Sequence, residues 1–530
     1  MSTILLDLEN SLHTNTFWSQ YRSFCNNLHN EDINVEEFFI LLPIIFKQIE
    51  NNALSYQIYD AVNKFCEFQP SKGLELYTII KTSENLQILS LIPATLSGLI
   101  KSERSINKFV EVEFLLKNNS ELLKNQGYAF LATLTVEELN QYSDIRDLLY
   151  TELKADIENN KTVFFSQIVR VLGKFIKIIY EADEYLVLLS KSDSEDVLFQ
   201  ITRLLNYELD LDANFKLFKI ILSNLTIIDS SYHGIINQLN YGVFPKLGTN
   251  HPELIEKFLK EWLLAGEKRA SGILKFADTL EQFHEKNAGH FKKMVSTWLN
   301  SDYAVLHEAV SKILMELPHY QFTDLELDHD YIFQLSYQDI EFIVAKIVGF
   351  LYLKELIRST IFSILKVKIN DEQCVTYLTA IFNQYIVFNY PSTIEYLEAE
   401  KKNSPKKVKK VIDEIIQFNQ NYYEKINQLD LINEFNPSDR RLKIYNSIHQ
   451  KGFQIKHKET SESRNSFLNM CRTVQLRTGK GMFSKHGERY TEKTEMSRIQ
   501  YSTEFPRGEF IDAIGQEKIR VVYRNYKREI

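Results

Sequence analysis

The feature that most constrains this chain is residues 99–244, which contain no proline and only four glycines. Proline and glycine are the residues that most often interrupt helices, so their scarcity permits long runs of helix here. Apolar residues in this stretch recur at spacings of three and four, as in Phe164, Ile168 and Val171. That spacing is typical of an amphipathic helix rather than of a strand. The sequence therefore predicts a succession of amphipathic helices across this region.

Short polar breaks separate the predicted helices, and several breaks carry helix start signals. Thr135 and Glu138 have the spacing of a capping box, in which each side chain bonds a backbone N–H at the other end. Thr323 and Glu326 repeat this spacing. Pro252 suits the first turn of another helix, where its missing N–H is not needed. Such segments continue to about residue 400, so we expect almost no strand in that part of the chain.

Residues 340–365 are expected to form one of the most buried helical segments. Their apolar residues occupy more than one face of a helix, which is typical of a helix surrounded by others. We expect Phe350 to belong to this core, so that its replacement by Ala would lower stability by about 3 to 5 kcal/mol.

A chain of 530 residues built from such helices fits a stacked array better than a single bundle. One hydrophobic core stops growing at roughly 250 to 300 residues, whereas helical pairs that pack only on their neighbours can be added without that limit. Successive helical segments are expected at residues 252–263, 272–283, 291–299 and 304–317. In this pattern, residues 1–400 resemble the HEAT and armadillo classes of α-solenoid. The resemblance implies an irregular helical-repeat solenoid; because no matching residues recur at a fixed period of about 40, a large irregular helical domain remains the alternative.

Cysteine usage and hydropathy favour a soluble, cytoplasmic protein. Cys25, Cys66, Cys374 and Cys471 lie far apart, which suggests neither a disulfide framework nor a structural zinc site. The first residues lack the basic start and apolar stretch of a signal peptide. Residues 373–394 form the longest uncharged window, but their Gln, Asn and Thr content disfavours insertion into a membrane. We therefore expect no membrane association.

The composition changes after residue 400, and two boundaries follow. Residues 401–436 form a lysine-rich linker and a helix, with six lysines in residues 401–410. Residues 437–530 are richer in glycine and are predicted to form a small basic α+β module. Within that module, residues 518–526 alternate apolar and polar side chains and therefore predict a strand. The predicted fold is thus mostly α, with an acidic solenoid over residues 1–400.

Charge is distributed very unevenly between these regions. Residues 401–530 carry 27 Lys+Arg and 16 Asp+Glu, a net charge of +11, whereas residues 1–400 have a net charge of −19. One interpretation is that the basic end folds back onto the acidic body. The other is that it binds an external polyanion, since clustered cations release counterions from a phosphate backbone. Both interpretations stay open at the level of sequence.

Candidate anion-binding residues surround a glycine-containing segment of the C-terminal module. Glycines let backbone N–H groups approach an anion, and nearby cations neutralise it. The candidates for contact with nucleic acid or another acidic surface are Arg472, Arg477, Lys480, Lys485 and Arg489. The segment is not a P-loop, because Val474 and Gly481 occupy positions where that motif needs Gly and Ser or Thr.

No catalytic motif of a familiar enzyme class occurs in the chain, and no cofactor or metal is predicted. His284 and His290 lack a zinc-ligand spacing. We therefore expect an interaction scaffold that binds a protein partner and, through its basic module, nucleic acid or another acidic surface. Such a scaffold would act within a multi-protein system, for example in bacterial defence. The alternative is an enzyme with nuclease or nucleotide-directed chemistry in residues 437–530, in which His449, His457 and His486 are the acid–base candidates.

Overall fold

The computed structural model describes most of the chain and divides it into two compact units, unit 1 (Met1–Lys286) and unit 2 (Asn287–Ile530). The described residues are 3–12, 14, 16–50, 56–102, 107–248, 250–266, 269–317, 322–428 and 506–528, with 443, 447, 450 and 451 and four short strands between the last two ranges. For the strands, only the backbone is described.

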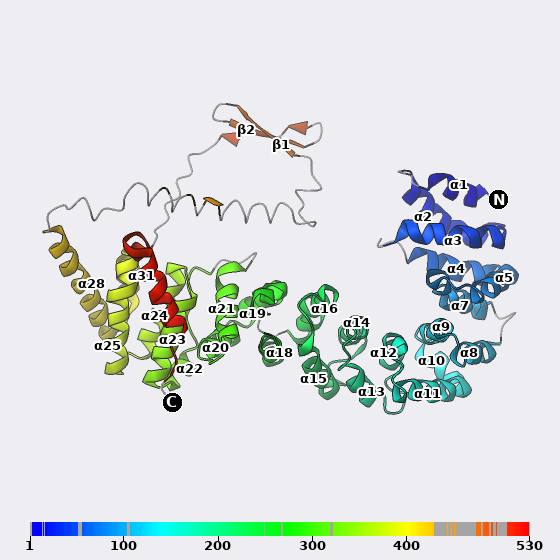
Figure 1. Ribbon diagram of the computed structural model, residues 1–530, viewed down its shortest axis with the longest axis horizontal. Helices are drawn as coiled ribbons and strands as arrows, with labels where there is room; N and C mark the ends of the chain where they lie inside the picture. The colour runs from blue at the N-terminus through cyan, green and yellow to red at the C-terminus, as the bar shows by residue number, and fades with distance from the viewer. Residues whose placement is uncertain are drawn as a thin grey trace. The chain divides into compact units, whose positions relative to one another are not determined.

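Unit 1 consists of short helices that follow one another along the chain (Figure 1). Their bounds are α1 Thr3–Ser11, α2 Phe17–Asn27, η1 Leu28–Asn30, α3 Val35–Ile49, α4 Gln57–Phe68, α5 Pro70–Lys81, α6 Leu86–Leu89, α7 Ile92–Lys101, α8 Lys108–Leu116, α9 Glu121–Leu131, α10 Val136–Gln141, α11 Ser143–Glu158, η2 Thr162–Phe164, α12 Phe165–Lys174, α13 Ala182–Leu189, α14 Glu195–Arg203, η3 Leu204–Glu208, α15 Phe215–Asn224, η4 Leu225–Ile227, α16 His233–Gln238, η5 Leu239–Val243, α17 Phe244–Leu247, α18 Pro252–Leu264, η6 Arg269–Phe276 and α19 Ala277–Lys286.

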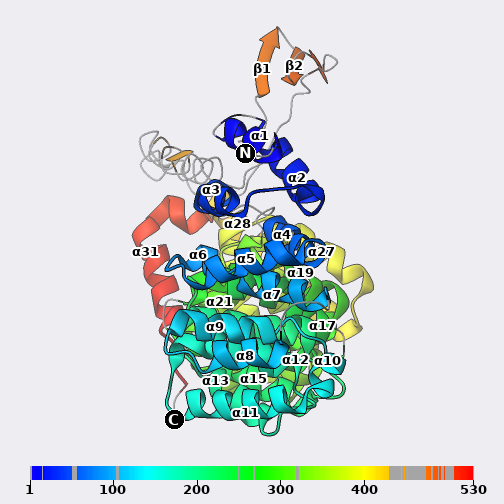
Figure 2. The ribbon, with the colours of Figure 1, turned by 90° about the vertical axis from the view of Figure 1, so that its right-hand side faces the viewer.

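The helices of unit 1 pack on near neighbours in the sequence. One layer runs through α2, α4, α7, α9, α12, α14 and α16, each of which contacts the next, and α13, α15 and α18 form a second run. Figure 2 shows α5, α7, α8 and α11 one below another down the unit. Side-chain hydrogen bonds join neighbouring pairs at sequence separations such as 31 for Asn63–Ala94, 42 for Lys174–Ala132 and 38 for Asn240–Asp278. Local packing of this kind is what a stacked array requires.

Unit 2 continues with the same type of packing and contains the strands. Its elements are α20 Ala288–Leu299, α21 Ala304–Glu316, α22 His329–Gln334, α23 Tyr337–Phe350, α24 Lys354–Val367, α25 Glu372–Ile381, η7 Phe382–Ile386, α26 Val387–Asn389, α27 Thr393–Asn403, α28 Lys406–Asn427, β1 Thr473–Thr478, β2 Gly481–His486, β3 Arg489–Tyr490, β4 Thr494–Glu495 and α31 Arg507–Arg524. Here α20, α22 and α24 form one run, and α21, α23 and α25 form the other. The strand β1 pairs antiparallel with β2, and β2 also pairs with β3 and β4.

The buried segment expected at residues 340–365 is present, but as two helices. The helices α23 and α24 are separated by residues 351–353, and most of their apolar side chains are buried. Phe350, the last residue of α23, is intermediate in burial; its ring centroid lies 5.3 Å from that of the buried His307 and 6.0 Å from the Arg524 guanidinium. The cost expected for Phe350→Ala stays a prediction. Phe362 of α24, which is 0 % exposed, lies in the core.

The helix start signals have mixed outcomes. Thr135 and Glu138 form the expected capping box, and Pro252 is the first residue of α18. Glu326 does not cap a helix; it pairs with Lys292 and Lys366, which explains why the spacing from Thr323 misled.

The strand expected at residues 518–526 was wrong. This segment belongs to α31, which bends at Asp512 and continues as helix to Arg524. The Asp512 carboxylate accepts a hydrogen bond from the Gly515 N–H at 2.9 Å, so it caps the second part of the helix. Figure 1 shows α31 beside α23, on which it packs.

None of the helices in the described ranges is long and apolar enough to cross a bilayer.

Candidate interaction surfaces

The five basic residues expected to bind anions are only partly placed. Arg472 and Lys480 lie outside the described residues. Arg477, Lys485 and Arg489 lie on β1, β2 and β3, where the backbone register opposes Arg477 to Met482 and Arg489 to His486. Their contact with an anion stays a prediction.

The six lysines at residues 401–410 lie at the junction of α27 and α28. Lys401 pairs with Asp413, and the Lys407 ammonium donates to Asn370 Oδ1 at 2.7 Å. Lys410 pairs with Glu414 at 3.7 Å. Part of this positive charge is therefore used to join neighbouring helices.

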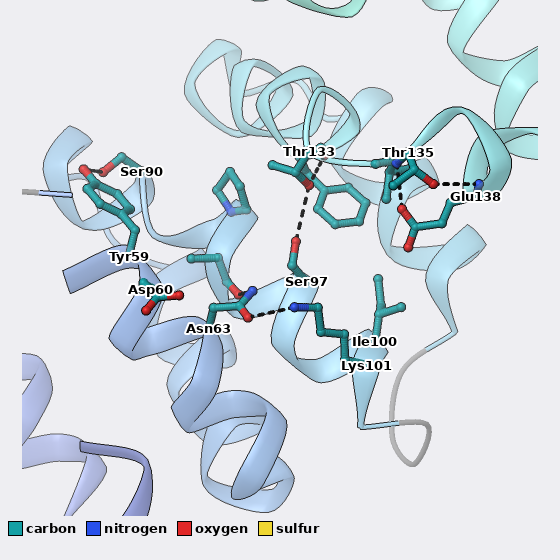
Figure 3. A pocket seen from close by; sticks show the side chains of 14 residues that line it. Tyr59, Asp60, Asn63, Ser90, Ser97, Ile100, Lys101, Thr133, Thr135 and Glu138 are labelled. Atoms are coloured by element: carbon teal, nitrogen blue, oxygen red, sulfur yellow. Dashed lines mark hydrogen bonds between the residues drawn. The ribbon is translucent and has the colours of Figure 1, made fainter. Parts of the chain in front are cut away.

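A surface groove of about 560 Å³ crosses α4, α7 and the α9–α10 turn (Figure 3). Beneath it α7 lies very close to α4 at Gly98, where an added Cβ would be 2.1 Å from the Asn63 carbonyl oxygen. The Asn63 amide then donates to the Ala94 carbonyl at 3.1 Å and ties the two helices together. We call this the α7 groove; it is lined by Tyr59, Asp60, Asn63, Ser90, Pro93, Ala94, Ser97, Ile100, Lys101, Phe130, Thr133, Leu134, Thr135 and Glu138.

Several polar groups of the α7 groove bond to one another. The hydroxyls of Ser97 and Thr133 are 3.3 Å apart, and Lys101 Nζ donates to Asn63 Oδ1 at 3.3 Å (Figure 3). The Glu138 carboxylate accepts from the Thr135 N–H as part of the capping box. These contacts position the groups, while each hydroxyl keeps further capacity to accept a hydrogen bond. The groove combines these polar groups with apolar side chains. That combination is typical of a binding site.

The C-terminal helix α31 is held on unit 2 by polar contacts at both ends. The Gly508 N–H donates to Asn389 Oδ1 at 2.9 Å near the start of the helix. At the far end, Lys346 Nζ donates to the carbonyl oxygens of Arg524 and Tyr526 at 2.7 and 2.8 Å. We call the residues that hold this helix and the residues just after it, up to Arg528, the α31-binding surface: Asn300, Asp302, Asp339, Lys346, Gly349, Tyr352, Tyr385 and Asn389.

Three arginines spaced by four residues face the α31-binding surface. Arg520 lies over the Tyr352 ring at 4.7 Å from its centroid, and Arg528 lies over the Phe342 ring at 4.2 Å. Arg524 donates to the Gly349 carbonyl at 2.7 Å and to the Tyr352 hydroxyl. Aromatic faces attract cations, and the planar guanidinium suits such stacked contacts.

Carboxylates complete the binding of the last arginine. Arg528 pairs with Asp302 at 3.2 Å and with Asp339 at 3.1 Å, and it donates to the Asn300 carbonyl at 2.6 Å. For residues 506–528, the basic end is therefore folded back onto the acidic body. This was one of the two interpretations left open by the charge distribution.

Two titratable groups beneath α31 are shifted by burial. Burial lowers the pKa of Lys346 to about 8, although the nearby Asp302 charge opposes the shift and Arg528 adds to it. Burial, reinforced by the Lys346 charge, lowers the pKa of His307 to about 4. His307 is therefore neutral at pH 7, and its Nε2 lies 2.7 Å from the Ser301 carbonyl.

An internal repeat that sequence reasoning missed lies in unit 1. Leu-Asn-Tyr occurs at residues 205–207 and again at 239–241, in the π-helical segments η3 and η5 that contact each other. In both copies the Asn side chain bonds to the next repeat: Asn206 donates to Gln238 at 2.8 Å, and Asn240 donates to Asp278 at 3.0 Å. The two copies are offset by 34 residues in the sequence, so a search at that separation, rather than at about 40, would have found them.

The described residues offer little that resembles a catalytic centre. Burial raises the pKa of the Cys25, Cys66 and Cys374 thiols to about 12, so they are not thiolates at pH 7. Among the described residues, no three His, Cys, Asp or Glu side chains are grouped so as to hold a metal ion. His449 and His457 lie outside the described residues, and only the backbone of His486 is described.

In the comparisons with known proteins, no family model matches this chain, and no curated protein matches it.

Proposed function

We propose that this protein is an interaction scaffold, a HEAT- or armadillo-like helical-repeat solenoid that binds a protein partner on its acidic helical surface. The proposal extends the observed pattern of short helices that pack on near neighbours in the sequence. Repeats of this type use such extended surfaces to hold other proteins.

The α7 groove is the observation that carries this proposal. It spans three successive helical elements, and its hydroxyls and amide can bond the backbone of a bound segment. Its lining has two acidic groups, Asp60 and Glu138, and one basic group, Lys101, within a body whose net charge is −19 over residues 1–400. A segment carrying basic side chains is therefore the partner chemistry that suits it.

The test is affinity capture of the full chain from its native lysate, with nuclease added, followed by mass spectrometry. Ser97→Trp fills the groove beside Thr133. We expect one or more proteins to be retained by the wild type and lost with Ser97→Trp. Ser143→Trp, at an exposed position on α11, is the control and should retain them. Equal retention by all three proteins would contradict the assignment to this groove.

The second part of the proposal is that the basic C-terminal region contacts nucleic acid or another acidic surface. Its support is the net charge of +11 over residues 401–530. Each lost phosphate contact reduces the salt dependence of binding, so Arg477→Ala/Lys480→Ala/Lys485→Ala should lower the slope of log affinity against log salt by about 2 to 3. Fluorescence anisotropy with single- and double-stranded probes measures this slope.

Two outcomes of this titration would redirect the proposal. If the wild type binds neither probe at low salt, the nucleic-acid part fails, and an acidic protein surface is left. If the triple variant binds with an unchanged slope, these three residues are not the contact, and the lysines of residues 401–410 would be tested next.

A further inference from the structure

The helix α31 is docked in an unusual orientation. An amphipathic surface helix normally turns its apolar side toward the body of the protein. In α31, Ile514 is 83 % exposed and Val522 is 61 % exposed, whereas Gln516 and Arg520 are buried. Unit 2 therefore holds the polar, arginine-bearing face of this helix.

The contacts on that face require guanidinium groups at particular positions along the segment. Arg520, Arg524 and Arg528 each meet an aromatic ring, and Arg528 also meets two carboxylates. Lys346 donates hydrogen bonds to two carbonyl oxygens at the end of the helix. These groups would hold any helix that brings arginines to the same three places and ends at the same point.

Gly349 fixes how closely a helix can approach this surface. An added Cβ at Gly349 would lie 2.8 Å from the Arg524 backbone nitrogen, so the two backbones touch only because this residue is glycine. The arrangement admits a helix backbone and leaves no room for a side chain between them.

We propose that the α31-binding surface is a recognition site for a basic helix that carries arginines at the positions of Arg520 and Arg524 and a third arginine just beyond its C-terminal end, and that α31 with the residues that follow it is the built-in occupant. A protein partner presenting such a helix replaces α31. The site is separate from the α7 groove and goes beyond the scaffold function proposed above.

The way in which α31 is held favours exchange. Its exposed isoleucines and valines contribute little hydrophobic stabilisation to docking. Beside the ring contacts of Tyr523 with Tyr385 and of Tyr526 with Phe342, the contacts that hold the segment include charged and cation–π pairs. Such contacts weaken as salt screens them. Residues 428–506 separate α31 from α28 in the sequence.

The test uses the full chain and a fluorescent peptide comprising residues 506–528, with binding followed by anisotropy. In the wild type, the chain's own helix competes, so the peptide should bind weakly. In Arg520→Ala/Arg524→Ala/Arg528→Ala, the internal helix loses its contacts while the surface is intact, and we expect the peptide to bind at least tenfold more tightly. Arg528→Ala alone should produce a smaller increase of about threefold.

Changes on the surface itself should have the opposite effect. Gly349→Ala and Asp302→Asn/Asp339→Asn, each combined with the triple arginine variant, should abolish the gain in peptide binding. Gly289→Ala, where an added Cβ meets nothing within 4 Å, is the matched control. A peptide in which the three arginines are replaced by Ala should not bind.

Three results would overturn the proposal. The first is that neither the triple variant nor Arg528→Ala binds the peptide more tightly than the wild type while circular dichroism shows both to be folded. The second is that the gain survives Gly349→Ala, which would place binding elsewhere. The third is equal binding of the arginine-free peptide. Because the peptide is the probe, each result leaves capture by the α7 groove unaffected.

Discussion

The helices α23 and α31 pack on each other, yet their apolar side chains are placed very differently. Ile343 and Ile347 of α23 are 0 % exposed, whereas Ile514 and Val522 of α31 are among the most exposed apolar side chains described. α23 contacts α21, α24, α25 and α31, while α31 packs mainly on α23 and α26. The number of neighbours a helix has, rather than its apolar content, decides whether its isoleucines are buried.

The same contrast separates two kinds of energetic contribution. α23 and α24 are held by hydrophobic burial, which does not depend on charge. α31 is held by hydrogen bonds of its arginines and of Lys346, which depend on charge. It also depends on the close approach of its backbone to Gly349. Changes in the two regions should therefore differ in size and in the conditions that reveal them.

The largest effect is expected in the core of α24. Phe362 is 0 % exposed, and the centroid of its ring lies 6.4 Å from that of Phe382 and 5.9 Å from that of Tyr396. Phe362→Ala removes these contacts and leaves a cavity, so the free energy of unfolding should fall by about 3 to 5 kcal/mol. Urea denaturation measures the change. Phe333→Ala, at a ring that is 66 % exposed, is the control and should cost less than about 1 kcal/mol.

The next effect concerns the contact between the two helices. Gly349→Ala forces the Arg524 backbone away, and overpacking of this kind typically costs about 1 to 3 kcal/mol. We expect α31 to undock, so trypsin should cleave after Arg520 and Arg524 at least tenfold faster. Gly289→Ala should leave cleavage unchanged. An unchanged rate in Gly349→Ala would mean that α31 accommodates the extra atom without leaving.

Acid should destabilise the region beneath α31 through His307. Its folded pKa of about 4 lies below the unfolded value of about 6.5, so between these pH values the unfolded chain binds more protons. The free energy of unfolding therefore falls as the pH falls through this window, by about 2 kcal/mol between pH 7 and pH 5 from this group. Urea denaturation of wild type and His307→Gln at both pH values isolates the contribution. An identical pH dependence in the two proteins would contradict the lowered pKa.

The sequence predicted the helical character of the body because its apolar spacing is local information. Burial at α23 followed from apolar residues on several faces, among them Phe342, Ile343 and Val344. The strand expected at residues 518–526 failed because alternation over so short a stretch does not distinguish a strand from a helix whose exposed face is apolar. There, tertiary contacts of Arg520 and Arg524 outweigh the local preference of the valines for a strand.

The interaction surfaces were much harder to predict. The α7 groove combines residues from Tyr59 to Glu138, and only the packing of α7 against both α4 and α9 brings them together. On the α31-binding surface, Asp302 pairs with Arg528. The two residues are so far apart in the sequence that their contact could not be predicted from it. The charge asymmetry did indicate that a basic end could meet an acidic body, but it could not identify the partners.

The smallest effect is expected on the outer face of α31, and it tests the comparison most directly. Ile514→Ser/Val522→Ser replaces apolar side chains that are already in water, so the free energy of unfolding should change by less than about 0.5 kcal/mol. In α23, the matched change Ile343→Ser should be strongly destabilising, because it buries a hydroxyl and leaves a cavity. Urea denaturation at two protein concentrations distinguishes the cases. Two results together would show that a second copy covers this face: the α31 variant loses more than about 1 kcal/mol, and the wild type becomes more stable as its concentration rises.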